Sequence, residues 1–267
     1  MTLSQALGLG ALQGVTEFLP ISSSGHLVLA QNFYPGLEDA SLLFNVVMHL
    51  GTTAAIVIVL RRRVAALLRA ALRLPFPSGR SAHPVEVRWI GLILLGSIPT
   101  AVIGFGLRDP VEAMQTRPAT VGAALLVTAA ILLAVNRYGR RSRGAEDLGW
   151  VDALLVGSAQ GLAVIPGISR SGATVAAGLF RNTRADVAVE FSMLLSIPAV
   201  LGANLLEAAR ASSPLPLEAA PLLAGLVAAF VTGALSLKAL QWVVGQRRLF
   251  GFAAYCGVVG LGAMTLG

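Results

Sequence analysis

The sequence predicts an all-α, polytopic membrane protein that forms a single membrane domain over residues 1–267. Two observations lead to this fold class. Of the 267 residues, 55% are hydrophobic and only 12% are charged, whereas a soluble domain carries about 25% charged residues. Six apolar stretches also approach the roughly 20 residues that cross the hydrocarbon core of a bilayer. We expect a transmembrane helix in each of these stretches, 42–60, 89–107, 119–135, 191–206, 221–240 and 250–266.

The basic residues are nearly all arginines, and most lie between the apolar stretches. A net charge of +7 also occurs in nucleic-acid-binding proteins. Membrane orientation explains the positions better, because cytoplasmic loops are rich in Lys and Arg. We therefore expect the connections 61–88, 137–143 and 181–184 on the cytoplasmic side and the connections near Leu37, Asp109 and Ala211 on the outer side. We expect membrane lipids, and no nucleic acid, as partners.

Part of the sequence is repeated at an offset of 147 residues. Residues 13–25 and 160–172 are identical at six of thirteen positions, where average residue usage predicts about one match. At the same offset, Phe44 falls on Phe191. We predict two halves of three spans each, 1–136 and 148–267. An odd number of crossings inverts the second half, and inverted repeats place their site between the halves, near the middle of the membrane.

The repeated segments, 3–31 and 150–179, are apolar but interrupted. Pro20 and three serines interrupt the first segment, and Pro166 with Gly167 interrupts the second, since proline and glycine stop a helix. The charge pattern requires each segment to return to the side that it entered. We therefore predict two re-entrant helix-turn-helix hairpins whose tips meet, because irregular backbone at that depth must be buried in protein. Two kinked transmembrane helices are the alternative.

Two charged residues, Glu17 and Arg170, fall inside the repeated segments. A charge at the bilayer centre costs about 2.5–3.5 kcal/mol, so each charge there calls for a reason. Gln13 and Glu17 are four residues apart, on one face of a helix. Their oxygens suit a hard divalent cation, Mg²⁺ or Ca²⁺. A buried ion pair between Glu17 and Arg170 that only joins the hairpins is the structural alternative.

Serines follow each interruption, and we expect them to cap new helices. Helix N-termini present unpaired N–H groups, and two that face each other make an anion site. Arg170 adds a planar fork for phosphate oxygens, and His26 is a candidate nucleophile or proton donor. We assign structural or solvated roles to His49 and His83. The expected anion ligands are Ser22, Ser24, Gly25, Ser169, Ser171, Gly172 and Thr174.

Two motifs in the chain resemble those of a known family. Residues 13–26, QGVTEFLPISSSGH, resemble the first signature of the undecaprenyl pyrophosphate phosphatases linked to bacitracin resistance. Residues 166–174, PGISRSGAT, are similar to their second signature. The resemblance extends through span order and chain length over essentially the whole sequence. The first acidic position of that signature is commonly Glu and is Gln13 here, which removes one carboxylate from a metal site.

The resemblance implies hydrolysis of undecaprenyl pyrophosphate to the monophosphate and inorganic phosphate in the bacterial plasma (inner) membrane. The reaction would recycle the carrier lipid of cell-wall synthesis, with the site facing the outer side. As a hypothesis, Glu17 and Gln13 position the cation, and Arg170 with the serines holds the pyrophosphate. His26 or Ser23 attacks the terminal phosphorus, or His26 activates water. A transporter or lipid flippase is the competing function, since it shares this architecture, and a homodimer stays open.

Overall fold

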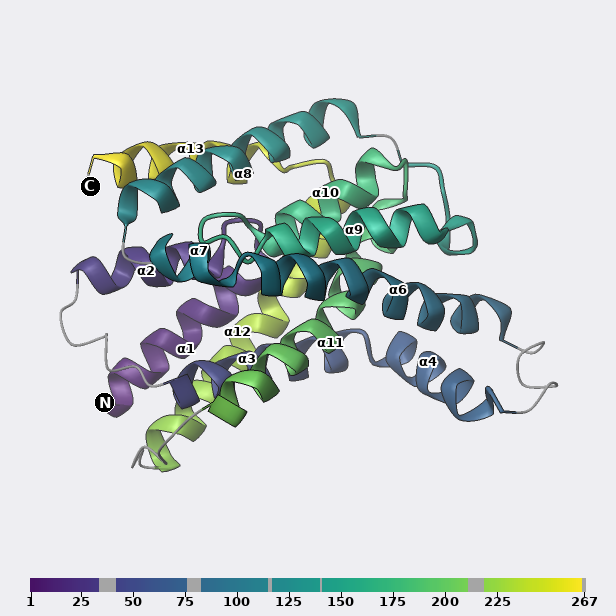
Figure 1. Cartoon of the computed structure of the whole chain (residues 1–267), viewed down its shortest axis with the longest axis horizontal. Helices are drawn as coiled ribbons and strands as arrows, with labels where there is room; N and C mark the ends of the chain where they lie inside the picture. The colour runs from purple at the N-terminus through teal and green to yellow at the C-terminus, as the bar shows by residue number, and fades with distance from the viewer. Residues whose placement is uncertain (34–41, 76–82, 115–116, 140, 211–218, 266–267) are drawn as a thin grey trace.

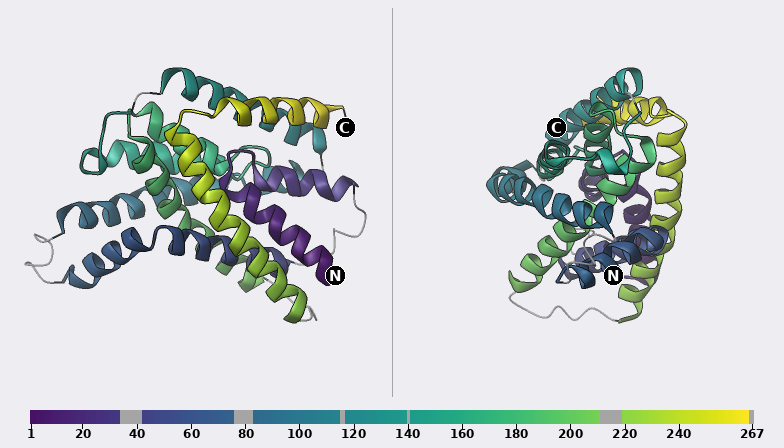
Figure 2. Two further views of the ribbon diagram at one scale, coloured as in Figure 1. Left: turned by 180° about the vertical axis from the view of Figure 1, so that it is seen from behind. Right: turned by 90° about the vertical axis from the view of Figure 1, so that its right-hand side faces the viewer.

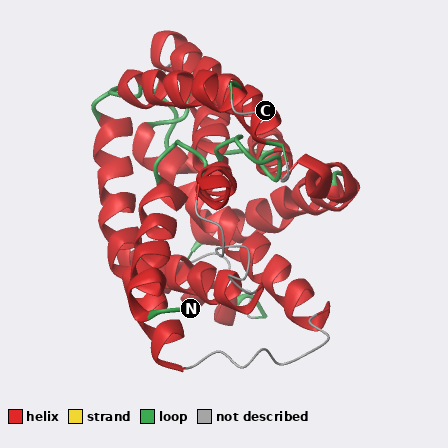
Figure 3. Cartoon of the chain, turned by 90° about the vertical axis from the view of Figure 1, so that its left-hand side faces the viewer, coloured by secondary structure: helices red, strands yellow, loops and turns green. Residues whose placement is uncertain are grey.

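The described part of the chain folds into helices. The computed structural model describes residues 1–33, 42–75, 83–114, 117–139, 141–210 and 219–265, and within these ranges it contains no strand, only an isolated β-bridge between Arg143 and Thr183 (Figure 3). The elements are α1 (Leu3–Phe18), α2 (Ser23–Phe33), α3 (Leu42–Val59), α4 (Arg61–Arg73), α6 (Pro84–Gly106), α7 (Arg108–Met114), α8 (Pro118–Tyr138), the 3₁₀ helix η1 (Ala145–Asp147), α9 (Trp150–Leu162), α10 (Arg170–Phe180), α11 (Ala185–Arg210), α12 (Ala219–Gly245) and α13 (Phe250–Met264).

Among the residues that the structure describes, four helices, α6, α8, α11 and α12, are long and apolar enough to cross a membrane. The bent pair α3 and α4, whose axes meet at 87°, makes a fifth span if it is counted as one. Each of the six predicted stretches coincides with a helix. However, α13 has 15 residues, fewer than the roughly 20 that a membrane span requires. The structure thus supports four or five spans by length and composition, and the count of six stays a prediction.

The outward faces of the long helices are apolar. Leu94, Val102 and Phe105 on α6 and Leu223 and Leu235 on α12 are each more than half exposed. A soluble monomer rarely exposes large apolar side chains in such numbers, because water penalises contiguous apolar surface. These faces are therefore suited to contact with lipid tails.

Both predicted helix interruptions are present. The chain turns through residues 19–22 between α1 and α2, and through residues 163–169 between α9 and α10. Ser22 at φ 70° and Gly167 at φ 100° adopt the left-handed conformation that reverses the chain direction. In Figure 1 the open ends of α1 and α2 lie toward the left edge, those of α9 and α10 lie toward the right edge, and the two turns meet in the middle. Figure 2 shows the same arrangement from behind.

The two turns touch each other directly. The Gly167 N–H donates to Ser22 Oγ at 3.1 Å, and Ser171 Oγ donates to the Leu19 carbonyl at 3.2 Å. A Cβ on Gly25 would lie 3.1 Å from Gly167 Cα, so only glycine permits this approach without movement. We call residues 19–25 and 163–172 the two tips. The tips form one polar unit at the centre of the molecule, as the sequence predicts.

Each hairpin also packs against a long helix from the other half of the chain. In α1, Gly10 lies against the backbone of Gly225 in α12; in α9, Gly157 lies against the backbone of Gly96 in α6. Gly10 and Gly157 are again 147 residues apart. Small residues at such crossings let helix backbones approach closely inside a membrane. The same close packing therefore holds the two hairpins in equivalent ways.

The base of the second hairpin is fixed by an acid between two arginines, outside the candidate spans. Asp152 accepts hydrogen bonds from Arg143 Nη2 at 2.7 Å and from Arg181 Nε at 2.8 Å. Burial by itself would raise the pKa of Asp152, but the hydrogen bonds from Arg143, Arg181 and the Gly149 N–H lower it to about 2. The ionised carboxylate thus ties the start of α9 to the end of α10.

Candidate active site

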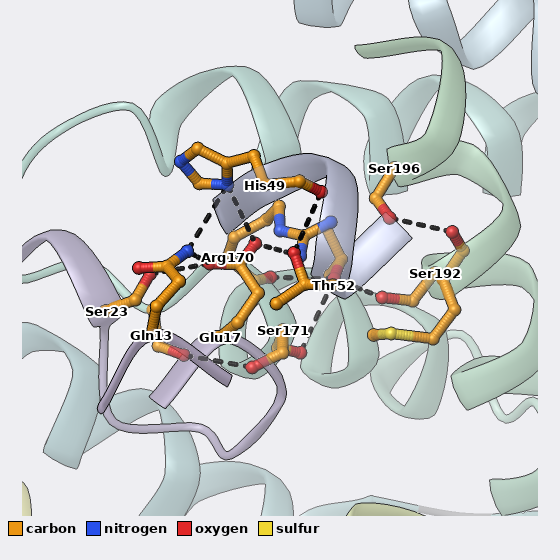
Figure 4. Close-up of polar contacts among 12 residues, drawn as sticks. Gln13, Glu17, Ser23, His49, Thr52, Arg170, Ser171, Ser192 and Ser196 are labelled. Carbon is orange, nitrogen blue, oxygen red and sulfur yellow. Dashed lines mark hydrogen bonds and ion pairs between the residues drawn. The ribbon is translucent and has the colours of Figure 1, made fainter. Parts of the chain in front are cut away.

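Polar side chains from four helices converge on Glu17, where the two tips meet (Figure 4). Gln13 and Glu17 come from α1, Ser23 begins α2, His49 comes from α3, and Arg170 begins α10. Glu17 is 7% exposed and Gln13 is 3% exposed. A carboxylate at such depth requires charged or hydrogen-bonding partners.

Both carboxylate oxygens of Glu17 are engaged. Oε2 accepts hydrogen bonds from Gln13 Nε2 at 2.8 Å and from Ser23 Oγ at 2.8 Å. Oε1 accepts a hydrogen bond from Arg170 Nη2 at 2.7 Å. The helical spacing of four residues between Gln13 and Glu17 accounts for the first contact. The predicted meeting of acid and guanidinium is therefore present, and a polar network surrounds it.

Arg170 has capacity for a further ligand. Its Nη2 is bound to Glu17, whereas Nη1 is buried and has no hydrogen-bond partner among the described residues. An unpaired buried donor on a charged group is costly. The fork of a guanidinium suits two oxygens of a phosphate group. The structure thus presents an anion-binding donor beside the carboxylate.

Three buried hydroxyls lie on the second tip or within two residues of it. Ser169, Ser171 and Thr174 are each 1% exposed. Ser169 Oγ caps α10 by accepting from the Gly172 N–H at 3.1 Å, and Thr174 Oγ1 lies 2.5 Å from Ser192 Oγ. In this arrangement the hydroxyls support the tip and bond within the protein. Their predicted contact with a phosphate group stays a prediction, as does that of the closely packed Gly172.

On the first tip, Ser22 and Gly25 also serve the turn itself. Ser22 Oγ accepts a hydrogen bond from the Gly25 N–H at 3.3 Å, and Ser24 Oγ lies 3.4 Å from Ser22 Oγ. Ser23 is the serine of this tip whose hydroxyl reaches the Glu17 carboxylate. The three neighbouring serines therefore have different surroundings, which the sequence alone does not distinguish.

His26 directly follows the first tip, and its ring nitrogens have partners other than Glu17. Nδ1 is 2.8 Å from the Ser22 carbonyl, and Nε2 is 2.8 Å from the hydroxyl of Tyr255 in α13. The two rings are stacked, with centroids 5.6 Å apart. The structure thus pairs His26 with Tyr255, a residue that the sequence does not single out, and the catalytic role of His26 stays a prediction.

Comparison with known proteins gives this arrangement its family. Residues 6–262 match the model of the family described as bacitracin resistance protein BacA. The chain belongs to the BacA family. It is 42% identical to an undecaprenyl-diphosphatase of Desulforapulum autotrophicum over all of this chain and 99% of that protein. It is 39% identical to one of Syntrophotalea carbinolica over 97% of each chain, and 41% identical to one of Desulfatibacillum aliphaticivorans over 94% of each.

In this BacA-family chain, His49, to which the sequence assigned a structural or solvated role, lies beside Gln13 and Glu17. His49 Nδ1 lies 3.3 Å from Gln13 Nε2 and 3.9 Å from Glu17 Oε1. Thr52, one turn later in α3, donates to the His49 carbonyl at 3.0 Å. An ionisable side chain inside a predicted span was the available signal, the same signal that selected Glu17 and Arg170. His83 is half-buried, and its Nε2 lies 3.3 Å from Nη1 of the exposed Arg73.

The donor atoms of the cluster decide whether a divalent cation fits. Within the described residues, no place gathers three or more His, Cys, Asp or Glu side chains that could hold a metal ion. Glu17 supplies one carboxylate to the cluster, and Gln13 supplies an amide next to it. Mg²⁺ commonly binds one or two carboxylates together with substrate phosphates. The cluster therefore fits a cation that arrives with a phosphate ligand.

Proposed function

We propose that this chain is a membrane-embedded phosphatase that hydrolyses undecaprenyl pyrophosphate to undecaprenyl phosphate and inorganic phosphate. Membership of the BacA family and full-length similarity to undecaprenyl-diphosphatases support this function. The activity recycles the carrier lipid of the cell wall. A transporter is not favoured, because the similar proteins are named as phosphatases.

One structural observation carries the proposal to particular residues. The unpaired Nη1 of Arg170 lies in the buried polar cluster that contains the Glu17 carboxylate. A pyrophosphate head group supplies the oxygens that this donor lacks, and it brings its terminal phosphorus close to Glu17 and Ser23. A guanidinium held in this way also stabilises the negative charge of phosphoryl transfer.

Ser23 is the proposed nucleophile, because its hydroxyl already donates to Glu17 Oε2 at 2.8 Å. Ser23 Oγ would attack the terminal phosphorus while its proton moves to Glu17, and the bond from that phosphorus to the bridging oxygen would break. Undecaprenyl phosphate would leave. Glu17 would pass this first proton to the departing phosphate. Water would then attack the phosphoserine and give a proton to Glu17 while the bond from phosphorus to Ser23 Oγ breaks. Ser23 Oγ would take that proton back from Glu17, and inorganic phosphate would be released. Recovery of phosphoserine at Ser23 after rapid quench supports this route; release without it indicates direct attack by water.

A divalent cation, Mg²⁺ or Ca²⁺, is proposed to bind with the substrate at the Glu17 carboxylate and the Gln13 amide oxygen. When bound, it would neutralise negative charge on the phosphate oxygens. The protein residues have separate tasks. Arg170 binds and orients the head group, Gln13 orients the carboxylate, and Glu17 accepts the proton.

We also propose the finer architecture for the BacA-family fold of this chain: six spans, two re-entrant hairpins, and two inverted halves, 1–136 and 148–267. The opposite directions of the hairpins in Figure 1 and the equivalent glycine contacts of α1 and α9 support it. The apolar lipid tail would leave the cluster sideways into the membrane. The site is proposed to face the outer side of the bacterial plasma membrane, opposite the arginine-rich connections.

The function is tested with purified protein in detergent, where no membrane separates two compartments. We expect release of inorganic phosphate from undecaprenyl pyrophosphate, lost on addition of a chelator and restored by a divalent cation. Arg170→Ala should remove most of the activity while the protein still elutes as a folded particle. Absence of phosphate release from folded wild-type protein under all cation conditions would overturn the proposal.

A further inference from the structure

The bend between α3 and α4 concentrates positive charge. The apolar segment Phe44–Val59 ends there, and Arg61, Arg62 and Arg63 follow as the first turn of α4, at 87° to α3. The N-cap residue, Leu60, makes no side-chain cap. A helix N-terminus carries partial positive charge and unpaired N–H groups, so cations there are unfavourable unless an anion joins them. We call this place the elbow.

The elbow contains a cavity with a basic lining. Its volume is ≈ 320 Å³. It lies apart from the Glu17 cluster, and none of the residues described above as part of that cluster lines it. The polar part of this lining consists of three arginines, one glutamate and one glutamine. The lining residues are Val59, Leu60, Arg61, Arg62, Arg63, Glu190 and Gln241.

The carboxylates near the elbow are committed to Arg63. Its Nε lies 3.3 Å from Glu190 Oε2 and its Nη1 lies 3.5 Å from Glu86 Oε1, while its guanidinium carbon lies 4.2 Å from the Trp89 ring centroid. No ion pair is found for Arg61 or Arg62 with any carboxylate among the described residues. Both side chains are exposed. Arg61 Nη1 donates a long hydrogen bond, 3.5 Å, to the Ile58 carbonyl. The elbow therefore keeps the Arg62 guanidinium and the other N–H groups of Arg61 available to an external anion.

The outer surface of α4 indicates where that anion comes from. Leu68 and Leu72 are 60% and 77% exposed, on the same short helix as the arginines, whereas Leu67 and Ala70 are buried. A helix that exposes leucine and arginine together is suited to the boundary between lipid tails and head groups. Phosphate groups of phospholipids lie at that level, and basic pockets beside membrane helices bind anionic head groups.

We propose that the elbow is a binding site for a phosphate group, supplied in the membrane by the head group of an anionic phospholipid. Arg61 and Arg62 pair with the phosphate oxygens, the first N–H groups of α4 point toward it, and Gln241 adds a polar contact. The site is separate from the catalytic cluster. A phosphate bound there would fix the C-terminal end of α3, and the N-terminal part of the same helix carries His49, which lies beside Glu17.

The test measures lipid binding to the whole purified protein in detergent by native mass spectrometry. The probes are short-chain phosphatidylglycerol, short-chain phosphatidylcholine and inorganic phosphate. We expect Arg61→Gln with Arg62→Gln to weaken phosphatidylglycerol binding about tenfold or more. The matched control is Arg69→Gln with Arg73→Gln, which removes the same charge from the same helix away from the elbow, and it should stay within about twofold of wild type.

Equal losses in the two double variants, or no loss in the Arg61 and Arg62 variant, would overturn the proposal, because charge alone would then explain binding. If the double glutamine variant does not fold, Arg61→Lys with Arg62→Lys keeps the charge but removes the fork, and it should still weaken binding. Inorganic phosphate can also bind at the Arg170 cluster. Phosphate binding is therefore assigned to the elbow only to the extent that the Arg61→Gln with Arg62→Gln variant loses it. If inorganic phosphate competes with phosphatidylglycerol for this elbow binding, the elbow is a general phosphate site. If it does not compete, the elbow binds the phosphate of a lipid head group.

Discussion

The two hairpins, α1–α2 and α9–α10, have the same backbone plan and different chemistry. At the repeat offset, Val164 stands where the first hairpin has Glu17, and Arg170 stands where it has Ser23. The first hairpin therefore supplies the acid and the hydroxyl, and the second supplies the guanidinium. The shared backbone plan brings the two tips together. The site depends on the positions at which the two copies differ.

Identical residues in the two hairpins also have different partners. Gln13 Nε2 donates to Glu17 and lies beside His49, whereas Gln160 Nε2 donates to the Leu195 carbonyl at 3.2 Å. One glutamine thus orients the carboxylate, and the other joins α9 to α11. Paired substitutions at repeat-equivalent positions can separate the chemistry of the site from the stability of the frame.

The largest difference is expected between Glu17→Ala and Val164→Ala. Glu17→Ala should lower kcat/KM for phosphate release at least about 10³-fold, because it removes the proton acceptor and leaves Arg170 without its partner. Val164→Ala, at the equivalent position, should retain near wild-type activity. Phosphate release by both purified variants measures this. Comparable activity of the two variants would show that the hairpins do not differ as described.

A smaller difference is expected between Gln13→Ala and Gln160→Ala. Loss of a hydrogen bond to the Glu17 carboxylate should lower activity about tenfold, with little change in Tm. Gln160→Ala should instead lower Tm by a few degrees while kcat stays close to the wild-type value. Activity and thermal unfolding are measured on the same preparations. A loss of activity in Gln160→Ala as large as in Gln13→Ala argues against separate roles.

A still smaller effect is expected at the next equivalent pair, His49 and Ser196. His49→Ala should lower activity about three- to tenfold, since the ring contacts Gln13 at 3.3 Å and approaches Glu17 at 3.9 Å without the direct bonding of Ser23. Ser196 Oγ donates to the Met193 carbonyl of its own helix, so Ser196→Ala should have no effect on activity. An inactive Ser196→Ala protein that is folded would contradict this assignment.

Substitutions at the bases of the two hairpins should differ in how the thermal stability of the protein depends on pH, and they should not differ in activity. Asp152, with a pKa of about 2, stands where the first hairpin has Gln5, an uncharged side chain that caps α1. A folded-state pKa below the unfolded value of 3.8 stabilises the protein by about 2 kcal/mol above pH 4, and this is lost as the pH falls toward 2. The gap in Tm between wild type and Asp152→Asn should therefore shrink from pH 6 to pH 3. A gap independent of pH would exclude this linkage.

Local sequence rules predict the frame and part of the site. Pro20 and Gly167 locate the turns, and the four-residue spacing places Gln13 and Glu17 on one face of α1, where they are hydrogen-bonded. The contact of Glu17 with Arg170 follows from the repeat, because equivalent tips of two facing hairpins meet. These features depend on backbone geometry within a short segment or on the repeat, and both are visible in the sequence.

Contacts that depend on helix rotation and tertiary packing were not predictable in this way. His49 reaches Gln13 because α3 packs against α1 with the face that carries His49. His26 hydrogen-bonds to Tyr255 because the start of α2 brings its ring to α13. The burial of Thr174 against Ser192 follows from the packing of α10 on α11. The predicted connections that include Glu38, Asp39 and Glu218 lie outside the described residues.

The central claim is that both tips hold one diphosphate head group between them. The most direct measurement is an experimental structure with a non-hydrolysable methylene-diphosphonate analogue of a polyprenyl pyrophosphate. We expect phosphonate oxygens at Arg170 Nη1, with the terminal phosphorus facing Ser23 Oγ. A head group bound elsewhere, with the pair of Glu17 and Arg170 undisturbed, would contradict it.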